Sequence, residues 1–163
     1  MQLGQQFRKI STIYTIKTPY PKIWVGSNNG NNDLSRELKY IDYKGKLNDV
    51  QRTEKLNNST YDRIITENIV IIPLWNASAN NSILECIEMN IPSFVTRLPA
   101  SEEYLGKDYP MFYTDISVVE KIINNRELLN QKYEETYNYL LNIDKSEITH
   151  EHFNSELLKI INL

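Results

Sequence analysis

The stretch that decides the fold is "NIVIIPLWNASANNSILECIEM", residues Asn68–Met89. Its first part, "NIVIIPLW" (Asn68–Trp75), is almost entirely apolar, as is typical of a strand buried on both faces of a parallel sheet. Its last part, "SILECIEM" (Ser82–Met89), has apolar residues at helical spacing. The residues between these two parts are small or polar. The pattern predicts a buried strand, a turn and a helix, in that order.

The rest of the chain repeats this alternation. Further strands are predicted at residues 20–27, 48–56, 91–97 and 109–113, and "MQLG" at the start resembles the end of another strand. Helices are predicted at residues 34–42, 60–66, 80–89, 99–106, 116–124, 126–142 and 146–162. The order favours an α/β fold, namely a Rossmann-like, doubly wound parallel sheet of about 4–6 strands. We expect helices on both faces of this sheet and a helical C-terminus.

Length, net charge and cysteine content limit the classes of protein to which this chain can belong. The 163 residues contain no internal repeat or linker, so we expect residues 1–163 to form one domain. A net charge of -3 argues against a nucleic-acid surface. No apolar run reaches the length of a transmembrane segment, and no signal peptide is visible. The single cysteine, Cys86, lies in an apolar pattern, so we expect it in the core of a protein from a reducing, cytoplasmic compartment.

The turn after the central strand is the candidate binding site. Ligands of open parallel sheets bind at the carboxyl ends of the strands, where "NASANNS" would lie. Small side chains let a ligand approach the backbone, and the N–H groups and dipole of a helix start favour a phosphate. Glu85 follows one turn later, and its carboxylate suits the two neighbouring hydroxyls of a ribose. The turn therefore indicates a nucleoside-diphosphate site.

Helix capping explains the same residues without a ligand. Asn and Ser are common N-caps, and a Glu in a first turn compensates the helix dipole. The residues alone leave both interpretations open. Trp75 is expected in the core, with a place in the pocket wall as the alternative. Glu102 and Glu103 are expected as charges at the start of a short helix.

A resemblance to a known family adds weight to the ligand interpretation. Through "NNSILECIEMNIP" (Asn80–Pro92) and "LPASEEYLG" (Leu98–Gly106), the chain resembles the carboxyl-terminal domain of GT-B glycosyltransferases. "LGQQFRKISTIY" (Leu3–Tyr14) is similar to the first strand-to-loop element of that domain, and "EHFNSELLKI" (Glu151–Ile160) to its closing helix. The resemblance covers most of the chain in order, and Ser78–Gly106 is its most specific part.

The resemblance implies a domain that holds a nucleotide-sugar donor, with Glu85 on the ribose. The residues implied at the diphosphate are Gly4, Arg8, Ser78, Asn80, Asn81 and Ser82. Those implied near the base are Lys55, Leu56 and Asn57. No cofactor is implied, because the nucleotide sugar is a substrate. The sequence has no Asp-x-Asp motif and no metal-ligand cluster, so we expect no metal site.

The sequence departs from the family at two places. Many retaining members carry a glutamate eight residues before the ribose-binding one, and Ala77 stands there in this chain. Gln5 follows Gly4, where an arginine is frequent. These positions concern the donor sugar and the phosphates, and the catalytic residues remain unassigned. Glu102 or Glu103 is the alternative residue for contact with the donor sugar.

The resemblance also implies a partner. GT-B enzymes work in a cleft between two Rossmann-like domains, and this chain has length for one. The glycan, lipid or protein acceptor would then be held by an amino-terminal domain or a partner chain, and a homo-oligomer is left open. A non-catalytic module for nucleotide-sugar binding or subunit interaction is the alternative function.

Overall fold

The fold is an all-parallel sheet with helices around it. The computed structural model describes residues 1–4, 7–26, 30–53, 56–76 and 80–161. Within these ranges six strands form one sheet in the order β3-β2-β1-β4-β5-β6, and every neighbouring pair is parallel. The strands are β1 (Gln2–Leu3), β2 (Lys22–Val25), β3 (Val50–Thr53), β4 (Val70–Ile72), β5 (Ser93–Thr96) and β6 (Phe112–Tyr113). This confirms the predicted Rossmann-like α/β class.

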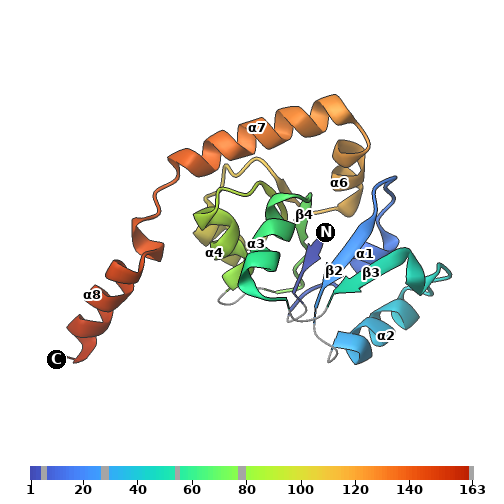
Figure 1. The fold of residues 1–163 in the computed structure, drawn as a ribbon, viewed down its shortest axis with the longest axis horizontal. Coiled ribbons are helices and arrows are strands. Elements are labelled where there is room, and N and C mark those ends of the chain that lie inside the picture. Colours follow the sequence, from blue (N-terminus) through green and yellow to red (C-terminus); the bar gives the residue numbers. More distant parts are fainter. Residues whose placement is uncertain (5–6, 27–29, 54–55, 77–79, 162–163) are drawn as a thin grey trace.

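Helices connect the strands and follow the last one (Figure 1). The α-helices are α1 (Ser11–Thr15), α2 (Gly30–Tyr40), α3 (Asn58–Thr66), α4 (Asn81–Glu88), α5 (Pro99–Leu105), α6 (Ile116–Ile123), α7 (Arg126–Asn142) and α8 (His150–Ile161). Two 3-10 turns, η1 (Leu47–Asp49) and η2 (Ser146–Ile148), complete the described elements.

The strand order explains how the helices divide between the faces. The chain winds outward from β1 to β3, then crosses to β4 and winds outward to β6. Because crossovers between parallel strands are right-handed, the two directions place their helices on opposite faces. Helices α1 and α2 pack together on one side, and α4 packs against α5 on the other. Helix α6 joins the α1 side, where the Glu120 carboxylate accepts the Lys17 N–H at 2.8 Å.

The core confirms two predictions and corrects a third. Trp24 and Cys86 are buried, as expected. Trp75, expected in the core, is 57 % exposed. Proline has no N–H with which to continue a ladder, and β4 ends at Ile72, directly before Pro73. Trp75 therefore lies beyond the sheet, at its carboxyl edge.

Helix α1 was missed from the sequence for a physical reason. Its first N–H groups are satisfied from another helix, since the Glu37 carboxylate of α2 accepts from the N–H of Ile10 at 3.1 Å and of Ser11 at 2.7 Å. The N-cap residue, Ile10, has no side-chain capping group, so the sequence carries no local signal for the start of α1. The predicted last helix is also divided, because η2 precedes α8.

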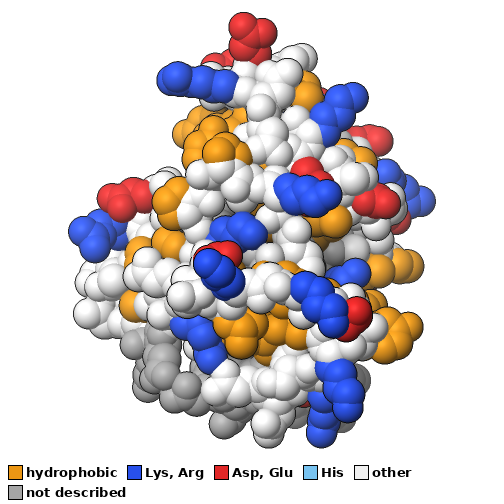
Figure 2. Space-filling model, turned by 90° about the vertical axis from the view of Figure 1, so that its right-hand side faces the viewer, with side chains coloured by type: hydrophobic (Ala, Val, Ile, Leu, Met, Phe, Trp, Pro, Cys, Tyr) orange, Lys and Arg blue, Asp and Glu red, His pale blue; other side chains and the backbone are white. Residues whose placement is uncertain are grey.

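The surface differs between the sheet body and the end of the chain. On the side of α1, α2 and β3, charged side chains of both signs lie among hydrophobic ones (Figure 2). Helix α8 extends away from the sheet, with Leu157, Leu158, Ile160 and Ile161 exposed (Figure 1). None of the helices in the described part of the chain combines the length and the apolar character that crossing a membrane requires.

Candidate functional site

The candidate site lies where the strand order reverses, between β1 and β4. In open α/β sheets the crevice outside the carboxyl ends of two such strands is the usual ligand position. Gly4 leaves β1 there with φ of 71°, a backbone conformation that side-chain-bearing residues rarely adopt. Its N–H donates to the Val25 carbonyl at 2.9 Å, which extends the parallel pairing of β1 with β2.

Arg8 brings a buried positive charge to this crevice. Its Nε donates to the Leu3 carbonyl at 3.1 Å, at the end of β1. Its Nη2 donates to Asn80 Oδ1 at 2.8 Å and to Ser82 Oγ at 3.3 Å, at the start of α4. The backbone of Arg8 pairs with Leu74 in an isolated antiparallel bridge. One guanidinium thus ties the end of β1 to the first turn of α4.

Asn80 has two roles at the start of α4. It is the N-cap, and its Oδ1 accepts the Ile83 N–H at 3.3 Å as well as the Arg8 hydrogen bond. The predicted capping role is therefore confirmed. A cap alone would not require an arginine from the β1–α1 connection at the same oxygen, so capping does not account for the whole arrangement.

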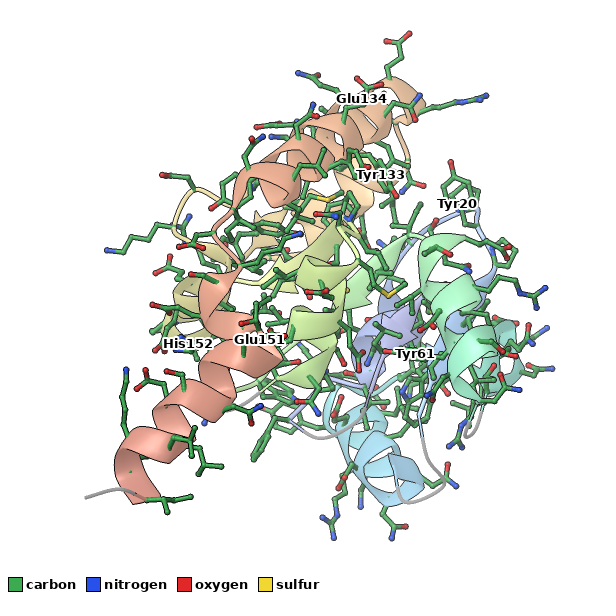
Figure 3. The ribbon with its side chains drawn as sticks, turned by 60° about the vertical axis from the view of Figure 1, so that its left-hand side comes forward. Tyr20, Tyr61, Tyr133, Glu134, Glu151 and His152 are labelled. Atoms are coloured by element: carbon green, nitrogen blue, oxygen red, sulfur yellow. The ribbon has the colours of Figure 1, made fainter. Side chains whose placement is uncertain are left out.

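Glu85 is held in place by a residue from a different helix. Tyr61 lies on α3 (Figure 3) and donates its hydroxyl hydrogen to Glu85 Oε2 of α4 at 2.6 Å. Within the described ranges no residue donates a hydrogen bond to the other oxygen, Oε1. A carboxylate offers about four acceptor positions, so most of this capacity is left for a ligand.

The charges of the site stabilise one another. Burial lowers the pKa of Arg8, and the nearby Tyr61 and Glu85 act in the opposite direction. Burial, followed by the hydrogen bond to Glu85, raises the pKa of Tyr61 well above its ordinary value. At neutral pH Tyr61 therefore keeps its hydroxyl proton and donates a hydrogen bond to Glu85, and the guanidinium of Arg8 remains charged.

Two of the three residues predicted near the base, Leu56 and Asn57, lie next to α3, the helix that carries Tyr61. Asn57 caps α3, and its backbone carbonyl accepts the Tyr61 N–H at 2.9 Å. Asn57 is therefore one helical turn before the tyrosine that holds Glu85. Leu56 is half-buried beside it. Lys55 lies outside the described residues.

The other predicted site residues are placed as follows. Asn81 is the first residue of α4, and its side chain is exposed. Ser78, and the divergent positions Gln5 and Ala77, lie outside the described residues. The structure thus brings together Gly4, Arg8, Asn80, Ser82 and Glu85.

Glu102 and Glu103 occupy the start of α5, as expected. Glu102 lies in the first turn and pairs with Arg97, with 2.6 Å between its Oε1 and Nε. Glu103 is exposed. Because Glu102 pairs with Arg97, its carboxylate lies at the β5–α5 turn.

Open space adjoins Glu85. Together with Leu84, Glu88 and Thr149 it lines a surface cavity of about 560 Å³ between α4 and the start of α8. Glu151 of α8 borders the same cavity (Figure 3). In the ranges that the structure describes, His, Cys, Asp and Glu side chains form no group of three or more that could hold a metal ion.

Comparisons with protein-family models, with curated proteins and with solved structures found no match for this chain. The geometry of the site therefore carries the functional argument.

Sequence reasoning missed Tyr61, which positions Glu85. Tyrosine is common on half-buried helix faces, and nothing in "NNSTYDRIIT" distinguishes this one. The signal that could have found it is spatial, because α3 and α4 both cover the same side of neighbouring strands.

Proposed function

We propose that this chain is the donor-binding domain of a glycosyltransferase of the GT-B type, which binds a nucleoside-diphosphate sugar at the carboxyl edge of its sheet. The observation that carries this proposal is the convergence of Arg8, the start of α4 and Glu85 at the switch point between β1 and β4. A cation and the N–H groups at the start of a helix suit the diphosphate, and a carboxylate one turn later suits the ribose.

The arrangement also supports a chemical role. When a glycosyl group transfers, the bond between the sugar and the diphosphate breaks, and negative charge develops on the leaving diphosphate. Arg8 and the N–H groups of α4 would stabilise that charge, and a water-poor site strengthens such interactions. The acceptor would be a glycan, lipid or protein held by a partner domain or chain.

Titration calorimetry of the whole chain with UDP, GDP, ADP and their sugars tests the proposal. We expect one nucleotide to bind, and Glu85→Gln to weaken it about ten- to a hundredfold, since a hydrogen bond to a charged group contributes about 1.5–3 kcal/mol. Glu134→Gln is the control, because it removes the same charge from an exposed position on α7, outside the cavity that Glu85 lines. Absence of binding, or equal losses in both variants, would contradict the proposal.

A second function, a non-catalytic module for subunit interaction, is favoured by α8. Four apolar side chains at its end are exposed, namely Leu157, Leu158, Ile160 and Ile161. Sedimentation of the wild type and of Leu158→Glu tests this function. Self-association that the substitution abolishes, together with nucleotide binding but no turnover, would favour the module over the enzyme.

A further inference from the structure

A cavity of about 550 Å³ lies beside α1 and α2, and its volume is within the range of small-molecule sites. Its wall combines two aromatic side chains, Tyr40 and Trp75, with two cations, Lys9 and Arg36. Ile41 adds an aliphatic side chain. The described residues of this wall include none from α3 or α4, so the cavity is separate from the candidate site.

A short antiparallel pairing at the edge of the sheet positions part of this wall. The Trp75 N–H donates to the Phe7 carbonyl at 3.0 Å. The Lys9 N–H donates to the Pro73 carbonyl at 2.9 Å. Neighbouring residues of paired segments point to opposite sides. Arg8 therefore points to the start of α4, whereas Lys9 and Trp75 point to this cavity.

The aromatic side chains of the wall are exposed, and one of them is fixed in place. The indole N–H of Trp75 donates to Glu37 Oε1 at 3.4 Å, and the Lys9 ammonium lies 4.9 Å from the centre of its ring. Tyr40, at the end of α2, is 88 % exposed. Exposed hydrophobic side chains that gather at one cavity mark interaction sites. Aromatic side chains pair favourably with other aromatic rings, so the wall favours a planar aromatic ligand.

The charges on the α2 side of the wall favour an anion. Glu37 is a carboxylate of the wall, and its two oxygens accept the N–H groups of Ile10 and Ser11. These N–H groups offset its negative charge within the protein. Arg36 pairs with Asp33 at 3.8 Å, and both side chains are exposed. Such pairs are weak, so the Arg36 guanidinium can donate to a ligand.

Lys9 supplies the second cation. It forms no ion pair with any residue in the described part of the chain. Its nearest acidic neighbour is Asp115, whose pKa is lowered mainly by hydrogen bonding to Ser117, with a smaller contribution from Lys9. Asp115 does not line this cavity. A cationic ligand would meet two positive charges here, whereas an anion would be attracted by both.

We propose that this cavity binds a planar aromatic anion, namely an aryl carboxylate or an aryl phosphate. The ring of the ligand lies against Trp75 and Tyr40. Its negative charge is held by Lys9 and Arg36. The inference goes beyond the proposed function and does not depend on it, because these four residues have no role in the nucleotide-sugar site.

The two tryptophans of the chain provide the readout. Trp24 is buried, and its indole N–H donates to the Gly4 carbonyl at 3.0 Å, whereas Trp75 borders the cavity. NMR spectra of the isotope-labelled whole chain separate the two indole N–H signals, and Trp75→Phe assigns them. Naphthoate and naphthyl phosphate are the probes. Naphthamide, which is neutral, and cyclohexanecarboxylate, which has no aromatic ring, are the control ligands.

Arg36→Gln and Tyr40→Ala test the wall. Both side chains are exposed, so thermal unfolding is expected to stay close to that of the wild type. Arg126→Gln and Tyr137→Ala are the matched controls, at exposed positions of α7 outside the cavity.

We expect naphthoate to shift the Trp75 signal and to leave the Trp24 signal in place. Tyr40→Ala should weaken this binding about two- to tenfold, as the loss of one aromatic contact predicts. Arg36→Gln should weaken it about two- to fivefold, as the loss of one exposed charge pair predicts. The α7 variants should bind as the wild type does, and both control ligands should bind more weakly than naphthoate.

Three results would overturn the proposal. The first is absence of naphthoate and naphthyl phosphate binding, whether or not a nucleotide binds. The second is equal binding of naphthoate and the two control ligands. The third is wild-type affinity for naphthoate in both Arg36→Gln and Tyr40→Ala.

Titration of the same variants with nucleotides separates this proposal from the proposed function. Binding of a nucleotide that Glu85→Gln weakens and Tyr40→Ala leaves unchanged supports two separate sites. A nucleotide that Tyr40→Ala weakens and Glu85→Gln leaves unchanged would itself be the aromatic anion of this cavity. That result would retain the cavity proposal and overturn the proposed function.

Discussion

Two neighbouring strand-to-helix turns, β4–α4 and β5–α5, leave the same edge of the sheet and are built differently. The β5–α5 turn is satisfied locally. Ser101 Oγ accepts the Leu98 N–H at 2.9 Å and donates to the Thr96 carbonyl at 2.8 Å, Pro99 occupies the first turn, and Arg97 pairs with Glu102. The polar groups of this turn are therefore bonded to one another, without a contribution from distant parts of the chain.

The β4–α4 turn depends on distant parts of the chain. Arg8 reaches it from the β1–α1 connection, and Tyr61 reaches its glutamate from α3. Contacts between residues this far apart in sequence cost more chain entropy to form than local ones. The comparison indicates that β4–α4 is a site assembled by the fold, whereas β5–α5 is a self-contained turn.

The largest difference between the two turns is expected when the arginine of each is removed. Arg8→Met should lower the free energy of unfolding by about 2–4 kcal/mol, because buried acceptors lose a charged donor and Glu85 loses a nearby cation. Arg97→Met should cost about 0–1 kcal/mol, since the Arg97 side chain is 46 % exposed and such pairs are weak. Urea unfolding at pH 7 measures both, and equal losses would mean that the two turns do not differ.

The caps give the next largest effect. Asn80→Ala should cost about 2 kcal/mol, because it removes both the cap of α4 and the partner of Arg8. Asn57→Ala, at the exposed cap of α3, should cost about 1 kcal/mol. Urea unfolding of both variants tests the difference. Identical losses would show that the Arg8 hydrogen bond adds nothing to the cap.

A smaller difference is expected when a tyrosine hydroxyl is removed near each turn, by Tyr61→Phe at β4–α4 and by Tyr104→Phe at β5–α5. Loss of the hydrogen bond to Glu85 should lower the free energy of unfolding by about 1 kcal/mol. Tyr104→Phe, at a half-buried position of α5, should be near neutral, because no hydrogen bond of its hydroxyl appears among the described residues. Thermal unfolding followed by circular dichroism checks both. A neutral Tyr61→Phe would mean that Glu85 is positioned by α4 alone.

The same contrast explains what could be predicted from the sequence. Buried parallel strands are nearly continuous apolar runs, so "NIVIIPLW" predicted β4, and helical spacing predicted α4. Local chemistry predicted the cap at Asn80. Tyr61 could not be predicted, because its role depends on α3 and α4 lying side by side. Helix α1 was missed for a related reason, since its cap comes from Glu37 on α2.

The smallest predicted effect concerns a third turn at this edge, β6–α6, whose cap is charged. Hydrogen bonding to Ser117 lowers the pKa of Asp115 below its ordinary value. A carboxylate with a lowered folded-state pKa contributes stability above its unfolded pKa of about 3.9, and this contribution disappears as the pH falls through the folded value.

Asp115→Asn keeps a capping oxygen but cannot titrate. Above about pH 5 the free energies of unfolding of the two proteins should run parallel with pH, and below that value the wild type should lose stability more steeply. The Asn80 cap of α4 is uncharged, so Asn80→Ala should shift the whole stability curve without changing its acid slope. Urea unfolding at intervals from pH 2.5 to pH 7 separates the two patterns. An unchanged acid slope in Asp115→Asn would show that the β6–α6 cap acts, like Asn80, through hydrogen bonding and not through charge.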